Sequence, residues 1–381
     1  MKKFVSMLLA LTLVCTLLTG MSVQAADDDA ALIIYTQSGE FGAKTVAKSY
    51  TAAELKKLAE TKEDGYGYQY SKSGWQAVVA TEYVTLDALL ADAGVTFAEG
   101  STLHFVCTDG EYTKFAPSYK DIAEGKYFFD GETATEVPAA IAISWTNGAL
   151  ADGTVADLAK TSKDSGSLRF VCGTTEADYT SEKAAGKRMP SGVISISVAT
   201  ESVSYTDVAD GSWYHDAVTY CSDNGLFKGV GEGKFAPAQQ MTMAELATVL
   251  YRVAGNTTDG SGEKWYSQPQ AWTAEKEIIA ADSFDAAANV DRAAFVTMFY
   301  KTLALDSKYD TKVTDEMRKA VEAATDYASI DAADVDAIAW AVSVGLIKGT
   351  DGSTLTVNPA AQINRAEVCT MLQRYYTGLA K

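Results

Sequence analysis

The sequence DAVTYCSDNGLFKG at residues 216–229 returns as DAIAWAVSVGLIKG at residues 336–349. Aliphatic residues match aliphatic residues, Tyr220 matches Trp340, and Gly-Leu-x-Lys-Gly closes both copies. In each copy the apolar residues recur at helical spacing, and a glycine follows where a helix favours a left-handed terminal residue. An internal repeat constrains the architecture more strongly than any local pattern, so each copy predicts an amphipathic helix that ends at a glycine.

A second predicted helix follows each copy. Phe-Ala-Pro at 235–237 leads to Thr242 after the first copy, and Val-Asn-Pro at 357–359 leads to Asn364 after the second. Thr242 and Asn364 are favourable N-cap residues, and each precedes a glutamate by three positions, which is the pattern of a capping box. Each copy is therefore expected to be half of a helix–loop–helix repeat.

A divergent repeat lies between these two. Trp-Tyr at 265–266 matches Trp-Tyr at 213–214, and Asp-Arg-Ala-Ala-Phe at 291–295 opens its second predicted helix. Ile-Ile at 278–279 matches the Leu-Phe pair of the first copy, but the glycines and the lysine are replaced by Glu277 and two alanines. One such repeat cannot bury its apolar face alone, so we expect the three to pack into one bundle.

The residues before the repeats have a different composition. Between 31 and 200, stretches rich in β-branched and aromatic residues predict strands, and capped segments after Thr51 and Thr85 predict two helices. The expected fold class is multidomain, with a mixed α+β, β-rich domain at 31–200 followed by an all-α bundle. The bundle is expected to comprise repeat 1 at 204–255, divergent repeat 2 at 256–306, a linking helix at 307–326 and repeat 3 at 327–381.

Residues 1–25 have the pattern of a secretory signal peptide. Lys2 and Lys3 precede an apolar run, and Val-Gln-Ala at 23–25 supplies a small-residue cleavage site before Ala26. The apolar run is short for a bilayer span, and three aspartates follow it. We therefore expect secretion with cleavage rather than an uncleaved anchor, and no stable membrane span after cleavage.

The chain is strongly acidic, with a formal net charge of −18. Such a surface repels nucleic acid and anionic lipid, so both are poor partners. A zinc site is not indicated, because the cysteines are widely separated and only two histidines are present. Cys221 and Cys369 occupy apolar positions of predicted helices. Cys107 and Cys172 follow aromatic–aliphatic pairs in predicted strands, where a disulfide and two buried thiols are both compatible with the sequence.

The repeats resemble the S-layer homology (SLH) domain. The resemblance is carried by Trp213, Gly-Leu-Phe-Lys-Gly at 225–229, Phe-Ala-Pro at 235–237 and Arg-Ala-Glu at 365–367, and it covers about residue 204 to the C-terminus. It implies a secreted bacterial surface protein that is held non-covalently by secondary cell-wall polysaccharide, which often carries pyruvate ketals. It thus implies a localisation at the cell wall or S-layer.

The resemblance also implies a set of polysaccharide-binding residues. Arg292 and Arg365 follow a helix cap, where a planar guanidinium and the helix amides suit a carboxylate. Lysines at the glycine-flanked ends of the first helices would add charge, and tryptophans would stack on a sugar ring, although such lysines also suit a helix C-terminus and such tryptophans a core. Met243 replaces the arginine in repeat 1, so that site should be weak or lost. The expected set is Arg292, Arg365, Glu367, Lys228, Lys348, Gly229, Gly349, Trp213 and Trp265.

Residues 48–199 resemble, more loosely, the sulfite-oxidase-type molybdopterin-binding domain. The matching segments are Tyr-Thr-Ala-Ala-Glu-Leu at 50–55, Val-Thr-Leu-Asp-Ala-Leu-Leu at 84–90 and Thr-Asp-Gly-Glu-Tyr at 108–112. In that family a cysteine thiolate after the first helix binds molybdenum, but residues 68–75 contain no cysteine. The sequence therefore favours a non-catalytic or ligand-binding module with no cofactor, no metal ligand and no catalytic residue. The alternative is a wall-anchored molybdopterin-dependent oxidoreductase.

Overall fold

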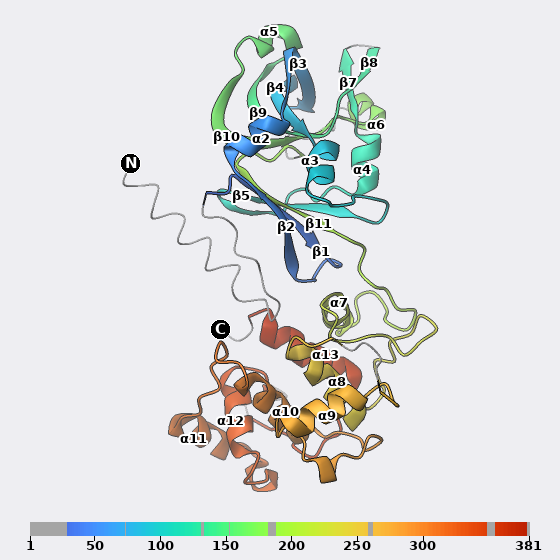
Figure 1. The fold of residues 1–381 in the computed structure, drawn as a ribbon, viewed down its shortest axis with the longest axis vertical. Coiled ribbons are helices and arrows are strands. Elements are labelled where there is room, and N and C mark those ends of the chain that lie inside the picture. The colour runs from blue at the N-terminus through green and yellow to red at the C-terminus, as the bar shows by residue number, and fades with distance from the viewer. Residues whose placement is uncertain are drawn as a thin grey trace. The chain divides into compact units, whose positions relative to one another are not determined.

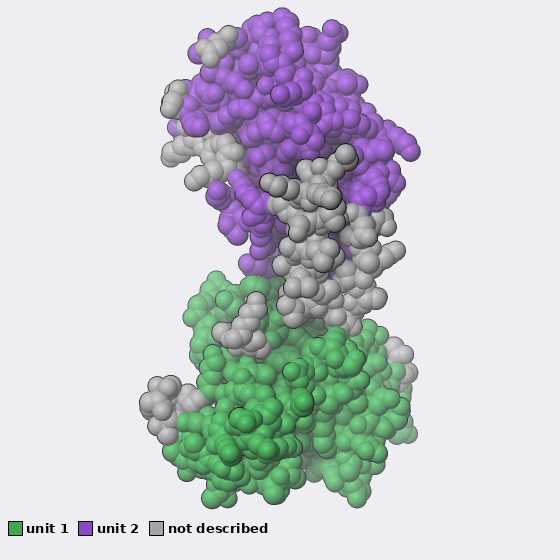
Figure 2. Space-filling view, turned by 90° about the vertical axis from the view of Figure 1, so that its left-hand side faces the viewer, with its two compact units in different colours: residues 1–22, 41–43, 202–381 green, residues 23–40, 44–201 purple. Residues whose placement is uncertain are grey.

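The computed structural model describes residues 29–72, 74–130, 133–151, 153–181, 188–257, 262–348 and 355–378. The chain divides into two compact units, shown in Figure 2. The N-terminal unit is built mainly from residues 44–201 and the C-terminal unit from residues 202–381. The predicted signal peptide at 1–25 lies outside the described residues, so it stays a prediction.

The N-terminal unit contains a five-stranded sheet, a four-stranded sheet and a two-stranded ribbon (Figure 1). The first sheet has the order β2-β1-β11-β5-β6, in which β1 and β11 are parallel and the other neighbours antiparallel. The second has the antiparallel order β10-β9-β4-β3, and β7 pairs with β8. The strands are β1 Leu32–Gln37, β2 Lys44–Tyr50, β3 Glu60–Ser71, β4 Trp75–Thr85, β5 Thr102–Cys107, β6 Gly110–Tyr112, β7 Tyr127–Asp130, β8 Thr133–Glu136, β9 Ala140–Ala149, β10 Lys163–Val171 and β11 Val193–Ala199.

The two larger sheets share one apolar core. Phe105 of β5 and Phe170 of β10 are both buried, and their ring centroids lie 4.7 Å apart. Both predicted caps are confirmed, because the Thr51 and Thr85 side chains accept hydrogen bonds from amides three residues later. Leu89 in the second of these helices is buried in the same core. The helices of this unit are α2 Ala52–Leu58, α3 Leu86–Asp92, α4 Tyr119–Glu124, α5 Val155–Ala159 and α6 Glu176–Thr180.

The four described cysteines are free and buried. Of the two arrangements that the sequence left open for Cys107 and Cys172, the structure has buried thiols. Burial raises the pKa of Cys107, and it raises the pKa of Cys172 to about 12. Both side chains are therefore protonated at neutral pH and act as small apolar core residues.

The C-terminal unit contains the three helix pairs that the repeats predict (Figure 1). The pairs are α7 with α8, α9 with α10, and α12 with α13, and α11 falls within the predicted linking segment. The six paired helices and α11 contribute to one continuous buried core. The elements are α7 His215–Asp223, α8 Met243–Val253, α9 Ser267–Glu275, η3 Ala281–Ser283, α10 Arg292–Ala304, α11 Asp315–Glu322, η4 Tyr327–Ser329, α12 Val335–Ser343 and α13 Arg365–Tyr376.

All three first helices end in the same way. A residue with left-handed φ follows the helix, at 67° for Gly225, 70° for Gly345 and 55° for Glu277. In each repeat the next two amides then donate to one carbonyl of the helix that precedes them. The acceptors are Cys221, Thr273 and Ala341. Repeat 2 therefore keeps the backbone geometry of the glycine-terminated helices although its glycine is gone, and the predicted match of its Ile-Ile pair is confirmed.

Three backbone hydrogen bonds close the repeats into a ring. The Met241 amide donates to the Ile363 carbonyl at 2.9 Å, Ile363 donates to Val290 at 3.1 Å, and Val290 donates to Met241 at 2.8 Å. Each of these residues immediately precedes the N-cap of the second helix in its repeat, and all three are buried. Because every repeat donates to one neighbour and accepts from the other, each repeat contacts both of the others.

The left-handed backbone at Glu277 generates a stability prediction. A non-glycine residue in this conformation costs about 1–2 kcal/mol, and part of that cost is offset by the greater flexibility of glycine in the unfolded chain. Glu277→Gly should therefore raise the free energy of unfolding by about 1 kcal/mol, measured by urea denaturation followed by circular dichroism. Glu277→Ala is the control, because it removes the charge but keeps Cβ. An equal gain in both variants would show that charge, not backbone conformation, limits stability here.

Candidate functional site

The start of each second helix is covered by the next repeat around the ring. The first two amides of α8, α10 and α13 donate to loop carbonyls of repeats 2, 3 and 1, respectively. The third amide donates to the N-cap side chain in each case. The prediction that these helix amides help to hold a carboxylate is therefore wrong, because the N-terminal donors already have partners. The six cross-repeat bonds join Met243 to Ala288, Ala244 to Ala286, Arg292 to Ala361, Ala293 to Pro359, Arg365 to Gln239, and Ala366 to Pro237.

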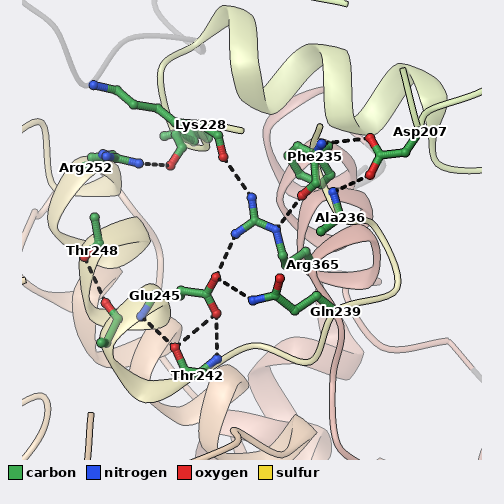
Figure 3. Close-up of polar contacts among 12 residues, drawn as sticks. Asp207, Lys228, Phe235, Ala236, Gln239, Thr242, Glu245, Thr248, Arg252 and Arg365 are labelled. Atoms are coloured by element: carbon green, nitrogen blue, oxygen red, sulfur yellow. Dashed lines mark hydrogen bonds and ion pairs between the residues drawn. The ribbon is translucent and has the colours of Figure 1, made fainter. Parts of the chain in front are cut away.

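Arg365 is buried where repeat 3 meets repeat 1, with 4% of the residue exposed (Figure 3). Its Nε donates to the Phe235 carbonyl at 2.9 Å, its Nη2 to the Lys228 carbonyl at 2.8 Å, and its Nη1 to Glu245 Oε1 at 3.0 Å. The guanidinium carbon lies 4.6 Å from the Phe235 ring centroid. The structure thus gives Arg365 a different role from the predicted one. Its guanidinium joins two repeats instead of facing a solvent-borne ligand.

Arg292 occupies the equivalent position where repeat 2 meets repeat 3, but its contacts are looser. Its side chain is 27% exposed, and Nη2 lies 3.9 Å from Glu367 Oε1. Among the described residues, none accepts a hydrogen bond from the buried Nε of Arg292. The described residues therefore leave this guanidinium incompletely hydrogen-bonded and partly open to solvent, so that it keeps a donor edge suited to a carboxylate.

The third junction, where repeat 1 meets repeat 2, carries no such charged pair. The positions equivalent to the arginine and the glutamate are Met243 and Ala294, and both are partly buried against the core. A half-buried carboxylate without its arginine would be strongly destabilising, and so would the arginine without its carboxylate. The simultaneous absence of both charges therefore has a physical reason: the arginine of one repeat and the glutamate of the next act as a pair.

The predicted lysines and glycines lie beside these junctions. Lys228 and Lys348 are exposed, and the Lys228 carbonyl accepts the hydrogen bond from Arg365. A Cβ at Gly229 would lie 2.7 Å from the Lys234 carbonyl oxygen and 2.7 Å from the Tyr205 ring, so only glycine fits there. Gly349 lies outside the described residues. Lys228 therefore adds positive charge at the rim of its junction, and Lys348 occupies the equivalent position in the sequence of repeat 3.

The predicted tryptophans are surface residues rather than core residues. Trp213 is 66% exposed and Trp265 is 57% exposed. Each packs edge to face against the tyrosine that follows it, with ring centroids 5.2 and 5.1 Å apart. Trp213 precedes α7 and Lys228 follows it, so about 13 Å of helix separates the two positions within repeat 1. The structure therefore does not gather all the predicted residues of one repeat into a single site.

Sequence reasoning missed a pair of aspartates that shape the junction loops. Asp207 accepts hydrogen bonds from the amides of Phe235 and Ala236, and Asp326 accepts them from the amides of Val357 and Asn358. Ala236 and Asn358 have left-handed φ values of 58° and 53°, which these hydrogen bonds stabilise. The recurrence of Thr-Asp at 206–207 and 325–326 is the signal that could have revealed them.

Arg252 supplies a second, half-buried guanidinium near Arg365 (Figure 3). Its Nη1 donates to the Leu226 carbonyl at 3.1 Å. Burial lowers the pKa of Arg252, and the charge of Arg365 lowers it further. Lys301 Nζ lies in the corresponding place in repeat 2, 3.4 Å from the Glu277 carbonyl. A basic residue in the last turn of the second helix thus satisfies the carbonyls that end the first helix.

Comparison with known proteins identifies the repeats. Residues 204–247 and 325–369 match the S-layer homology domain. The matched segments include α7 and the start of α8 in repeat 1, and α12 and the start of α13 in repeat 3. They contain two of the three ring residues, Met241 and Ile363, whereas Val290 lies between the matched segments.

Bacterial surface proteins are among the relatives. An S-layer protein of Bacillus licheniformis is 27% identical over 144 residues, which make up 34% of this chain and 16% of the relative. The S-layer protein EA1 of Bacillus anthracis is 23% identical over 190 residues, 47% of this chain and 20% of the relative. Cell surface glycoprotein 1 of Acetivibrio thermocellus is 46% identical over 46 residues, 12% of this chain and 2% of the relative. This chain thus spans a fifth or less of these relatives, and with the SLH matches they indicate a secreted, cell-surface protein.

No helix in the described part of the chain has the length and hydropathy required to cross a bilayer. Within the same residues, no group of three or more His, Cys, Asp or Glu side chains is arranged to hold a metal ion.

The Arg365–Glu245 pair generates a double-variant prediction. Arg365→Met leaves Glu245 half-buried without its partner and should lower the free energy of unfolding by about 3 kcal/mol, measured by urea denaturation. Adding Glu245→Ala reproduces the apolar junction of Met243 and Ala294 and should recover most of that loss. The matched control is Arg318→Met, which removes a surface pair and should cost much less than Arg365→Met. Additive losses in the double variant would contradict the pairing.

Proposed function

We propose that the C-terminal unit anchors this protein non-covalently to secondary cell-wall polysaccharide. SLH domains in general bind cell-wall polysaccharide, and two segments of this unit match that domain. The proposal rests on the state of Arg292. Its guanidinium is partly exposed, and the described residues leave its Nε–H without an acceptor. We place the acidic substituent of the glycan, such as the carboxylate of a pyruvate ketal, at Arg292.

The three junctions differ in what they offer to such a ligand. At the junction of repeats 3 and 1 the guanidinium is committed to protein acceptors, and at the junction of repeats 1 and 2 it is absent. At the junction of repeats 2 and 3, the described residues leave the Nε–H of Arg292 without an acceptor, and the exposed Lys348 follows α12 as Lys228 follows α7. The junction offers a planar donor fork, and we assign Lys348 to it as a second, flexible cation, which suits a carboxylate on a sugar.

Glu367 has a positioning role in this proposal. Its Oε2 accepts a hydrogen bond from the Asn364 amide at 2.9 Å, which fixes the carboxylate at the start of α13. Its Oε1 faces Arg292 at 3.9 Å, close enough to orient the guanidinium without saturating it. A ligand carboxylate can then add the shorter hydrogen bonds that Glu367 does not supply.

The exposed tryptophans extend the proposed glycan contact beyond the junctions. Trp213 and Trp265 present large aromatic surfaces to solvent at equivalent places in repeats 1 and 2. Exposed aromatic rings of this kind are enriched at binding surfaces, because they supply apolar area with few rotatable bonds. We assign them to sugar units of the polymer other than the one that carries the acidic substituent.

The N-terminal unit is proposed to be a displayed module without redox chemistry. A molybdenum-binding thiolate requires an accessible cysteine with a lowered pKa. Burial instead raises the pKa of both Cys107 and Cys172, and neither side chain is exposed. The residues of this unit therefore do not fit the molybdopterin cofactor of the sulfite-oxidase type, and we do not propose the oxidoreductase alternative.

Cell-wall sedimentation tests the anchoring function. Purified protein that begins after the predicted signal peptide should sediment with sacculi that retain their secondary polysaccharide. It should stay in the supernatant with sacculi from which that polymer has been extracted, because the peptidoglycan itself offers no ketal carboxylate. Equal sedimentation with both preparations would refute polysaccharide anchoring.

A substitution series tests the assignment of Arg292. Arg292→Gln should weaken retention on intact sacculi by about tenfold or more, because it removes a charged donor fork worth roughly 1.5–3 kcal/mol. Met243→Ala at the apolar junction should leave retention unchanged. Arg318→Gln controls for the loss of one positive charge away from every junction. Thermal unfolding of each variant separates lost binding from lost folding, and unchanged retention by a folded Arg292→Gln variant would exclude the assignment.

A further inference from the structure

Arg169 in β10 is a half-buried arginine that the N-terminal unit leaves without an acidic partner. No described residue accepts a hydrogen bond from its buried Nε, and no described carboxylate forms an ion pair with it. Burial lowers the pKa of Arg169, and the nearby phenols of Tyr70 and Tyr112 oppose that shift. The side chain stays charged, since a guanidinium does not lose its proton in proteins. A positive charge is therefore partly desolvated without compensation.

The fold holds this guanidinium in a defined place. Its central carbon lies 4.7 Å from the ring centroid of Trp145 in β9, and the Trp145 indole is fixed by a hydrogen bond of 2.9 Å to the Ser167 carbonyl. The register between β10 and β9 shifts between Asp164 and Arg169, so the pairing is irregular in the segment that leads to the arginine. β-Bulges and similar irregularities redirect a side chain and recur next to binding sites.

The contrast with Arg188 shows that an unpaired arginine is not the rule in this unit. Arg188 donates to Asp178, and its guanidinium carbon lies 5.7 Å from the Phe115 ring centroid. Arg169 has the corresponding aromatic contact without the carboxylate. Contact with Trp145 covers one face of the guanidinium, but the buried Nε–H has no acceptor among the described residues. A buried donor without an acceptor is destabilising, and a bound anion would offset that cost.

We propose that Arg169 is the centre of an anion-binding site that takes a carboxylate or phosphate group. Trp145 holds the guanidinium plane, and the edge that contains Nε supplies parallel donors to two oxygens of the ligand. The aromatic ring that is placed against the guanidinium is that of Trp145. This site lies within the N-terminal unit, so it is independent of the wall-anchoring function proposed for the C-terminal unit.

Selective labelling provides a direct test. The chain has seven arginines, so protein labelled with ¹⁵N-arginine gives seven Nε–H signals, and the signal missing in Arg169→Lys identifies Arg169. We expect titration with inorganic phosphate or with acetate, at constant ionic strength maintained by chloride, to displace the Arg169 signal saturably. Saturation by acetate alone identifies a carboxylate site, and saturation by phosphate alone identifies a phosphate site. No saturable displacement by either anion, or a parallel displacement of all seven signals, overturns the proposal.

Calorimetry supplies a second readout that does not depend on the labelled signal. The saturating anion should raise the unfolding temperature of the wild-type N-terminal unit, because it binds only the folded state. Arg169→Lys keeps the charge but loses the donor fork, so it should abolish most of that rise. Arg188→Lys, the matched control, should preserve it. An equal rise in the wild type and in Arg169→Lys would likewise overturn the proposal.

Discussion

Three backbone hydrogen bonds, made by Met241, Val290 and Ile363, determine how the C-terminal unit is assembled. All three residues are buried, so each unpaired amide or carbonyl would cost about 1–3 kcal/mol. The bonds run in one direction around the ring, and they bring the start of every second helix against a loop of the next repeat. That contact satisfies the N-terminal helix amides by backbone carbonyls. Side chains are then what distinguishes one junction from another.

The differences between the junctions follow from the energetics of partly buried charge. Arg365 and Glu245 are closely paired, with side-chain exposures of 5% and 15%, and a junction of this kind tolerates removal of both charges better than of one. Arg292 and Glu367 are farther apart and more exposed, so water or a ligand can complete their hydrogen bonding. Similar sequences thus produce one closely paired, buried junction and one looser, more exposed junction. Divergence of repeats around a closed ring can assign different roles to equivalent positions.

The N-terminal unit shows the same principle in a different fold. Its two larger sheets share a core in which the thiols of Cys107 and Cys172 are simply buried apolar groups. Arg169 in this unit contacts the Trp145 ring but, among the described residues, has no carboxylate partner such as Arg188 has in Asp178. Each unit therefore contains an arginine, Arg169 or Arg292, whose Nε–H has no acceptor among the described residues. Both lie in a chain whose overall charge is strongly negative.

Local signals in the sequence were sufficient for the helix pairs, because caps and helix ends act over a few residues. The capping box at Thr242 and the left-handed position at Gly225 are examples, and both are found in the structure. The roles of the arginines could not be read in this way. Arg365 is separated by 130 residues from the carbonyl of Phe235 and by 120 residues from the carboxylate of Glu245. Closure of the ring brings those groups together. Desolvation of a side chain depends on neighbours that are distant in sequence, so only the tertiary structure decided that Arg365 is buried and Arg292 is partly exposed.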